Sequence, residues 1–143
     1  MDRTECDVHS IIADCAVLSG DQALLVRYAN VNRYDHEAGW FVPDDEVRYL
    51  EHPERSAHRI LREQVGVDAP AVRLSHLESF RGNNRTWHLI FHYVAEFAEP
   101  PDVTPSEDVA AAGWFALDAL PPASEVAHHG WARETLDAIA ASR

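Results

Sequence analysis

The sequence predicts one α/β domain in which helices pack over a mixed β-sheet. Two observations predict this fold class: runs with strand character stand on both sides of one amphipathic segment with helical spacing, and a second helical segment ends the chain. The chain has 143 residues, 46% of them hydrophobic, which is enough for one core, so residues 1–143 are expected to form a single domain. An unrelated α+β domain is the alternative.

The first half of the chain indicates a hairpin, a loop, a short strand and a helix. Two β-rich runs, residues 8–18 and 22–28, flank a Ser-Gly-Asp turn and should pair. Residues 30–39 are polar and turn-rich, residues 40–43 form a short apolar strand, and residues 44–52 are expected to be a loop. From Pro53 to Val65 apolar residues recur at helical spacing, and Gly66 provides the stop.

The second half indicates three strands and a closing helix. Two β-rich runs, residues 72–80 and 86–97, flank an Arg-Gly-Asn-Asn turn at residues 81–84 and are expected to pair. A proline-rich loop at residues 100–105 precedes a strand at residues 112–116. A final helix is expected from about residue 124 to residue 141.

Charge and composition exclude several classes of protein. The net charge is −12, and the 12 basic residues, all arginine, are spread thinly, so a polynucleotide is not an expected partner. The apolar runs are far shorter than the roughly 20 residues that cross a bilayer, so no membrane partner is expected. The acidic N-terminus lacks the basic start of a signal peptide, which predicts a cytoplasmic protein. Cys6 and Cys15 are expected to be reduced thiols.

Residues 39–67 carry the most informative motif. After a Trp-x-x-Pro lead-in at Trp40 and Pro43, this segment resembles the Nudix box, G-x5-E-x7-R-E-U-x-E-E-x-G-U, in which U is a bulky aliphatic residue. The matching positions are Glu51, Arg59, Leu61, Glu63, Gly66 and Val67. Asp45, Ile60 and Gln64 depart from the pattern.

The resemblance extends over nearly the whole chain, because Glu107-Asp108 and then Trp114-Phe115-x-Leu117-Asp118 are similar to the family's closing strand. Membership of the Nudix hydrolase (MutT-like) family implies a Nudix-type α/β/α sandwich with a mixed β-sheet. It also implies hydrolysis of a nucleoside diphosphate-linked or related pyrophosphate with Mg²⁺ or Mn²⁺. The partner would then be a small nucleotide or another phosphorylated molecule.

The departures fall on the positions that the resemblance assigns to the metal. Pyrophosphate hydrolysis uses a hard cation that requires several oxygen ligands, and the family's helix provides three glutamates on one face. Those positions are Ile60, Glu63 and Gln64 here, so one carboxylate remains. Glu51 and Glu107 are further candidate ligands, although Glu51 also suits a helix cap. Residues 44–46, all acidic, are either replacement ligands or a solvated loop.

Candidate catalytic and substrate-binding residues follow from the same alignment. The catalytic candidates are Glu63, Arg59 and His58; Arg59 also suits an i, i+4 pair with Glu63 that is worth about 0.5 kcal/mol or less. His58 and His52 flank the helix face of Glu63, and either could act as a base. The substrate-binding candidates are Arg27, Trp40, Arg81 and Trp87, with core packing as the alternative for the aromatic residues.

The nine histidines suggest a transition-metal site as a third alternative. His88 and His92 share a strand face but should stand about 13 Å apart, too far to bind one ion together. His128 and His129 are expected to diverge by about 100° on the last helix. The others, such as His9, His36 and His76, could meet only if the fold brings them together, and most are expected to be surface or hydrogen-bonded histidines.

Two functional hypotheses therefore stand side by side. One is a Nudix pyrophosphohydrolase with a weakened or altered metal site. The other is a catalytically silent Nudix fold that binds a nucleotide as a sensor or interaction module. Substrate choice depends on loops whose conformation the sequence does not reveal, so the identity of the substrate is not predicted. The oligomeric state is not predicted either, and a homodimer is one option.

Overall fold

The computed structural model describes residues 9–33, 36–82 and 85–143. Cys6, the start of the expected first strand and the tip of the expected turn at residues 81–84 lie outside these ranges. The strands are β1 (His9–Ser19), β2 (Gln22–Tyr28), β3 (Asp44–Glu46), β4 (Arg73–Arg81), β5 (Trp87–Phe97) and β6 (Val109–Ala116). The helices are α1 (Pro53–Val65) and α2 (Ala127–Ala141). Among the described residues, no helix is long and apolar enough to cross a membrane.

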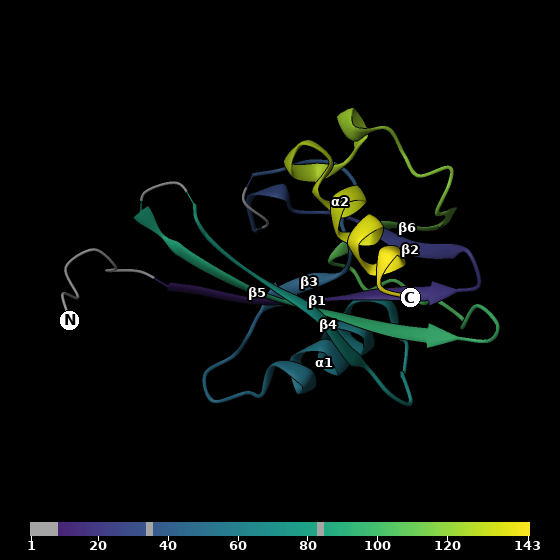
Figure 1. Ribbon diagram of the computed structural model, residues 1–143, viewed down its shortest axis with the longest axis horizontal. Helices are drawn as coiled ribbons and strands as arrows, with labels where there is room; N and C mark the ends of the chain where they lie inside the picture. The colour runs from purple at the N-terminus through teal and green to yellow at the C-terminus, as the bar shows by residue number, and fades with distance from the viewer. Residues whose placement is uncertain (1–8, 34–35, 83–84) are drawn as a thin grey trace.

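The strands form one mixed sheet in the order β4-β5-β1-β2-β6, with β3 paired to β1. The β1–β5 pair is parallel, and the other pairs are antiparallel. Figure 1 shows α1 on one side of the sheet and α2 on the other. The predicted α/β/α sandwich with a mixed sheet is therefore confirmed, as are both predicted hairpins.

Strand alternation builds a separate core on each face of the sheet. Cys15 and Val17 of β1 belong to the cluster that includes α1, whereas Ala16 and Leu18 belong to the cluster that includes α2. Side chains two residues apart on a strand point to the same face. Even-numbered residues of β1 and β5 therefore face α2, which decides where the polar residues of these strands lie.

Helix α1 has the bounds that the sequence predicts, because its start and stop are encoded locally. Pro53 occupies its first turn, and Nδ1 of His52 accepts a hydrogen bond from the Glu54 amide. Gly66 ends the helix with a left-handed φ of 66°, a conformation that glycine adopts without strain. The predicted apolar face is buried, with Ala57, Ile60, Leu61 and Val65 all fully covered.

The prediction for residues 40–52 was wrong in one respect. The regular strand is Asp44–Glu46, in the expected loop, while residues 40–43 contribute isolated bridges from Trp40 and Phe41. The reason is that β1 pairs with β2 only near the hairpin turn, so the rest of that edge of β1 pairs with β3. Backbone pairing satisfies the amide groups whatever the side-chain polarity.

The predicted closing helix is confirmed to its end at residue 141, but its predicted start near residue 124 was wrong. A 3₁₀ turn at Ala123–Glu125 precedes α2, and His128, His129 and Gly130 have left-handed φ angles of 53°, 57° and 95°. Regular helix therefore follows Gly130, whose missing Cβ would stand only 3.0 Å from Ala123. The two adjacent histidines do not follow helical geometry.

Candidate functional site

Arg59 is the centre of a carboxylate cluster between α1 and β3. Its guanidinium donates to both carboxylate oxygens of Glu51, at 2.8 and 2.9 Å, and to the carbonyl of Glu46 at 3.0 Å. Longer contacts of 3.3 and 3.4 Å reach Asp45 and Glu63. Hydrogen bonds from Arg59 lower the pKa of Glu51 to about 2, and those to Glu51 raise the pKa of Arg59. The cluster is an ion-pair network in which Arg59 and Glu51 are nearly buried and Glu63 is half-exposed.

Gln64 is bonded at both ends of its amide. The hydroxyl of Tyr28 donates to Oε1 of Gln64 at 2.8 Å, and Nε2 of Gln64 donates to the main-chain carbonyl of Asp44 at 2.8 Å. The side chain is buried, as is the neighbouring Tyr28. Gln64 therefore ties α1 to the end of β2 and the start of β3.

The other two candidate metal ligands, Glu63 and Glu107, take no part in the hydrogen bonds of Gln64. Glu63 is half-exposed, and its carboxylate also pairs with Arg48 at 3.3 Å. Glu107 is exposed just beyond Thr104 and Ser106, whose amides donate to the carbonyls of Val65 and Gln64, respectively. The loop thus brings Glu107 toward the last turn of α1.

The possible metal-ligating atoms around α1 do not fit the Mg²⁺ site that the resemblance to the family implies. Both oxygens of Glu51 are held by Arg59, Gln64 donates its amide to the Asp44 carbonyl, and Ile60 is fully buried and offers no donor. The guanidinium of Arg59 already engages the carboxylates that a hard cation would need as ligands. Within the described residues, these acids do not form a group with ligand atoms close enough to share an ion.

A cleft with a volume of about 790 Å³ lies on the α2 face of the sheet. Asp44 and Glu46 of β3 line one part of it, and Phe80 and His88 of the β4–β5 hairpin line another. The Phe80 and His88 rings are stacked, with centroids 5.0 Å apart. Because β3 also contacts Arg59 through Asp45 and Glu46, one strand joins the cleft to the α1 cluster.

The four substrate-binding candidates do not converge. Arg81 lines the cleft. Arg27 instead lies over the ring of Trp40, 4.8 Å from its centre, and Trp40 also packs edge-on against Phe115. Trp87 lies on the opposite sheet face from His88, where its indole N–H donates to Ser79.

Of the histidines near the Nudix box, His52 has a structural part and His58 lies next to the cluster. His52 caps α1. His58 is partly buried one residue before Arg59, so the two side chains leave the helix about 100° apart.

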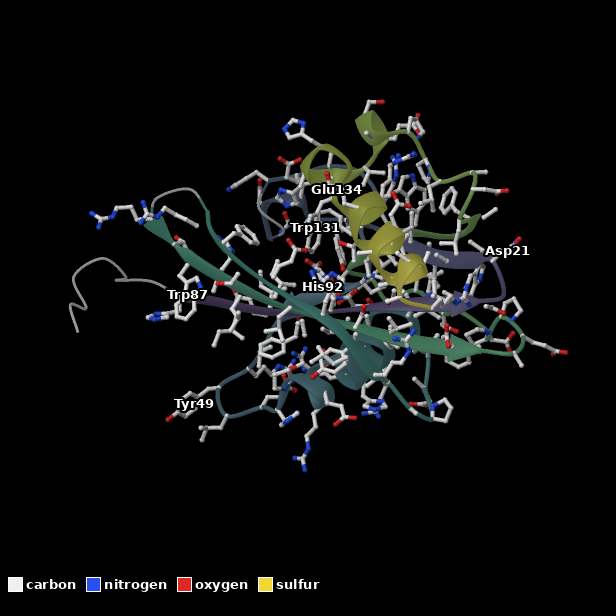
Figure 2. All side chains as sticks on the ribbon, viewed as in Figure 1. Asp21, Tyr49, Trp87, His92, Trp131 and Glu134 are labelled. Atoms are coloured by element: carbon white, nitrogen blue, oxygen red, sulfur yellow. The ribbon has the colours of Figure 1, made fainter. Side chains whose placement is uncertain are left out.

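A second polar cluster, which the sequence did not predict, lies under α2. Nδ1 of the fully buried His92 donates to both oxygens of Asp14, at 2.8 and 2.9 Å, and its Nε2 lies 2.6 Å from Oε1 of Glu78. The His76 ring stacks on His92, with centroids 4.4 Å apart. Figure 2 shows Trp131 of α2 beside His92, and their ring centroids are 5.4 Å apart.

The pKa values of the two histidines in this second cluster shift in opposite directions. Burial lowers the pKa of His92, but hydrogen bonds to Asp14 and Glu78 outweigh it, so the pKa is raised overall. Burial lowers the pKa of His76, and the charge of His92 lowers it further. The hydrogen bonds to the two acids therefore favour a proton on His92 over one on His76.

Comparisons with known proteins were made for sequence and for structure. A family model described as NUDIX domain matches residues 9–138. A sequence search of curated proteins found no match. A MutT NUDIX hydrolase from Burkholderia pseudomallei superposes with a TM-score of 0.74 at 23% identity, covering 92% of this chain and 98% of that one.

Two further solved structures share the fold at lower identity. The E. coli dihydroneopterin triphosphate pyrophosphohydrolase has a TM-score of 0.73 at 12% identity, with 96% of this chain and 100% of that chain covered. A C. elegans Ap4A hydrolase has a TM-score of 0.69 at 18% identity, with 93% and 96% covered.

Proposed function

The chain belongs to the NUDIX domain family, and we propose that it hydrolyses a small nucleotide in which a nucleoside diphosphate is linked to another group. One observation carries the proposal: β3 lines the cleft with Asp44 and Glu46 and holds Arg59 of the Nudix box on its other side. A substrate in the cleft would therefore extend its phosphates past β3 to reach the box. The proposed partner is a small molecule rather than a nucleic-acid polymer or a membrane.

The cleft suits a nucleotide in size and chemistry. Small-molecule sites usually have volumes of roughly 300–1,000 Å³, and this cleft has about 790 Å³. The Phe80–His88 stack and Trp131 offer flat surfaces to a base. Arg81 is the only arginine in the described lining, so we assign it to the phosphates, against the repulsion of a chain with a net charge of −12.

We assign the proton-accepting part of the reaction to Glu63. Water attacks a phosphorus atom of the diphosphate, the bond between that phosphorus and the bridging oxygen breaks, and Glu63 takes a proton from the attacking water. The departing phosphate group leaves with the bridging oxygen. Glu63 suits this role because it is half-exposed, whereas Glu51 is locked to Arg59. Arg59 is a positioning residue that orients Glu63 from 3.4 Å.

The test is a hydrolysis screen of the full chain with dinucleotides, nucleoside diphosphate sugars and nucleoside triphosphates, with products separated by chromatography. Glu63→Gln should lower turnover of any substrate by about 100-fold or more. Glu54→Gln is the matched control, because Glu54 is exposed in the first turn of the same helix. Equal turnover by wild type and Glu63→Gln would remove Glu63 from the reaction.

The screen also tests the family's use of Mg²⁺ or Mn²⁺. Each substrate is assayed with either ion and with excess chelator. Metal dependence predicts that turnover is lost in chelator and returns with one of the ions. Turnover that persists unchanged in chelator would rule the divalent cation out.

A second candidate function is a catalytically silent nucleotide-binding module. The observation that favours it is that Ile60 is buried and Gln64 is bonded at both ends, so two of the three metal positions are fixed parts of the fold. This version predicts that a nucleotide of the panel raises the melting temperature with no product formed. Clear turnover of any panel member would exclude it.

A further inference from the structure

We propose that His76, Glu78 and His92 form a binding site for a divalent transition-metal ion of the zinc class, on the sheet face opposite α1. One ligand atom from each residue lies within 4.8 Å of the other two. His76 and Glu78 come from β4 and His92 from β5. This site is separate from the Nudix box and does not depend on the proposed hydrolysis.

The hairpin register brings the three ligands together. His76 stands directly opposite His92, and Glu78 stands opposite Ile90, one pair further along the same face. Zinc ligands at bond lengths of about 2.0–2.1 Å are separated by roughly 3.3 Å in a tetrahedron. The observed separations bracket this value: 2.6 Å between Nε2 of His92 and Oε1 of Glu78, and at most 4.8 Å within the set. Small side-chain rotations would complete the geometry.

The donor types select the ion. Two imidazoles and one carboxylate are a set that protein zinc sites use, with a fourth position left for water or substrate. Mg²⁺ instead prefers oxygen ligands and keeps much of its water. Borderline-soft ions such as Zn²⁺ or Co²⁺ therefore fit this cluster, whereas the family's hard ions do not.

Hydrogen bonds select which nitrogen of each imidazole can serve as the ligand atom. Asp14, fully buried, accepts two bonds from Nδ1 of His92, which directs Nε2 of that ring toward Glu78. A carboxylate behind a ligating histidine is a recurrent feature of zinc sites. Nδ1 of His76 is held by the Ser75 hydroxyl at 2.9 Å, which leaves Nε2 as its ligand atom. Asp14 is thus a positioning residue.

Charge also favours a cation here. Asp14, fully buried, and Glu78, 37% exposed, flank the ring of His92, and a buried carboxylate is costly without a compensating positive charge. A divalent ion next to the His92 ring supplies two positive charges.

The experiment is a titration of the chelator-stripped full chain with Zn²⁺ and, separately, with Co²⁺. We expect one tightly bound Zn²⁺ per chain and a visible absorption spectrum of four-coordinate Co²⁺. His76→Ala and Glu78→Gln should each weaken Zn²⁺ affinity by 10-fold or more. His92 is not substituted, because it is fully buried and its loss could unfold the chain.

The matched control is His88→Ala. His88 is on the same strand and face as His92 but stacks on Phe80 and is not a member of the cluster. It should leave Zn²⁺ affinity unchanged, and thermal unfolding in chelator should show that all three variants fold. Absence of a tight Zn²⁺ equivalent in wild type, or the same affinity in wild type and in folded His76→Ala and Glu78→Gln, would overturn the proposal.

Discussion

Carboxylates gather at two places in this molecule, one on each face of the sheet, and the group at the centre differs. Near α1, Glu51, Asp45 and Glu63 surround the guanidinium of Arg59. Near α2, Asp14 and Glu78 flank the imidazole of His92. The two clusters use similar acids for different purposes.

The two clusters differ in whether the central group can release a proton. A guanidinium stays protonated at any ordinary pH and has five N–H donors but no acceptor, so the acids around Arg59 always face a positive charge. An imidazole can release its proton and then bind a metal through the same nitrogen. The central group of the α1 cluster therefore has a fixed charge, whereas the central group of the α2 cluster can exchange its proton for a metal ion.

The largest expected effect comes from removing the fixed charge. Arg59→Met should destabilise the chain by about 3 kcal/mol, because it leaves several carboxylates without a counter-charge in a nearly buried place. Chemical denaturation measures the loss. The control is Arg62→Met on the same helix, whose pair with Asp68 is exposed and should contribute about 0–1 kcal/mol. Equal losses would mean that the Arg59 network does not stabilise the fold.

The corresponding change in the second cluster is Asp14→Asn. It replaces a charge-assisted hydrogen bond to buried His92 and should cost about 2 kcal/mol in chelator. If the metal proposal holds, Zn²⁺ affinity should also fall about 10-fold. Asp137→Asn, an exposed site on α2, should change stability by less than about 0.5 kcal/mol. A folded Asp14→Asn chain with wild-type stability would contradict the assigned part of Asp14.

How far the sequence could predict these clusters depends on how local their contacts are. The bounds of α1 were predictable because Pro53 and Gly66 mark its ends. The i, i+4 pair of Arg59 with Glu63 was also predictable. The stronger bonds from Arg59 to Glu51 were not, because they depend on how the loop before the helix folds.

The second cluster was partly within reach of the sequence. The pairing of the two strands was predicted, but a turn at residues 81–84 would place His76 opposite residue 89 or 90, whereas the observed pairing of Arg81 with Trp87 places it opposite His92. The contact of His92 with Asp14 could not be predicted from the sequence. It arises from parallel pairing of β1 with β5, strands separated by 78 positions at this contact, which no local pattern specifies.

A smaller effect should follow from Gln64→Glu, which makes the α1 cluster resemble the family pattern. The new carboxylate faces the Asp44 carbonyl, so two acceptors meet where Nε2 now donates. We expect a loss of about 1.5 kcal/mol in chelator, measured by thermal unfolding. Mg²⁺ should recover part of it by bridging the two oxygens.

Gln22→Glu is the control for this change, because Gln22 is exposed at the start of β2. Its stability should not respond to Mg²⁺. A Gln64→Glu chain that is equally insensitive to Mg²⁺ would show that one carboxylate does not restore a cation site beside Arg59.

The smallest expected effect is the acid sensitivity of Glu51. Its pKa is about 2 in the folded chain against an ordinary 4.5, so the unfolded chain binds more protons between these values. The stabilisation by Glu51 is therefore complete well above pH 4.5 and is lost as the pH falls through 4.5 toward 2. Between pH 7 and pH 4 the loss should be about 1 kcal/mol. Glu51→Gln lacks this titration, so the difference in unfolding free energy between wild type and variant should narrow by that amount at pH 4. A constant difference across this range would mean that Arg59 does not hold Glu51 ionised, and the α1 cluster would then be no more fixed than the one around His92.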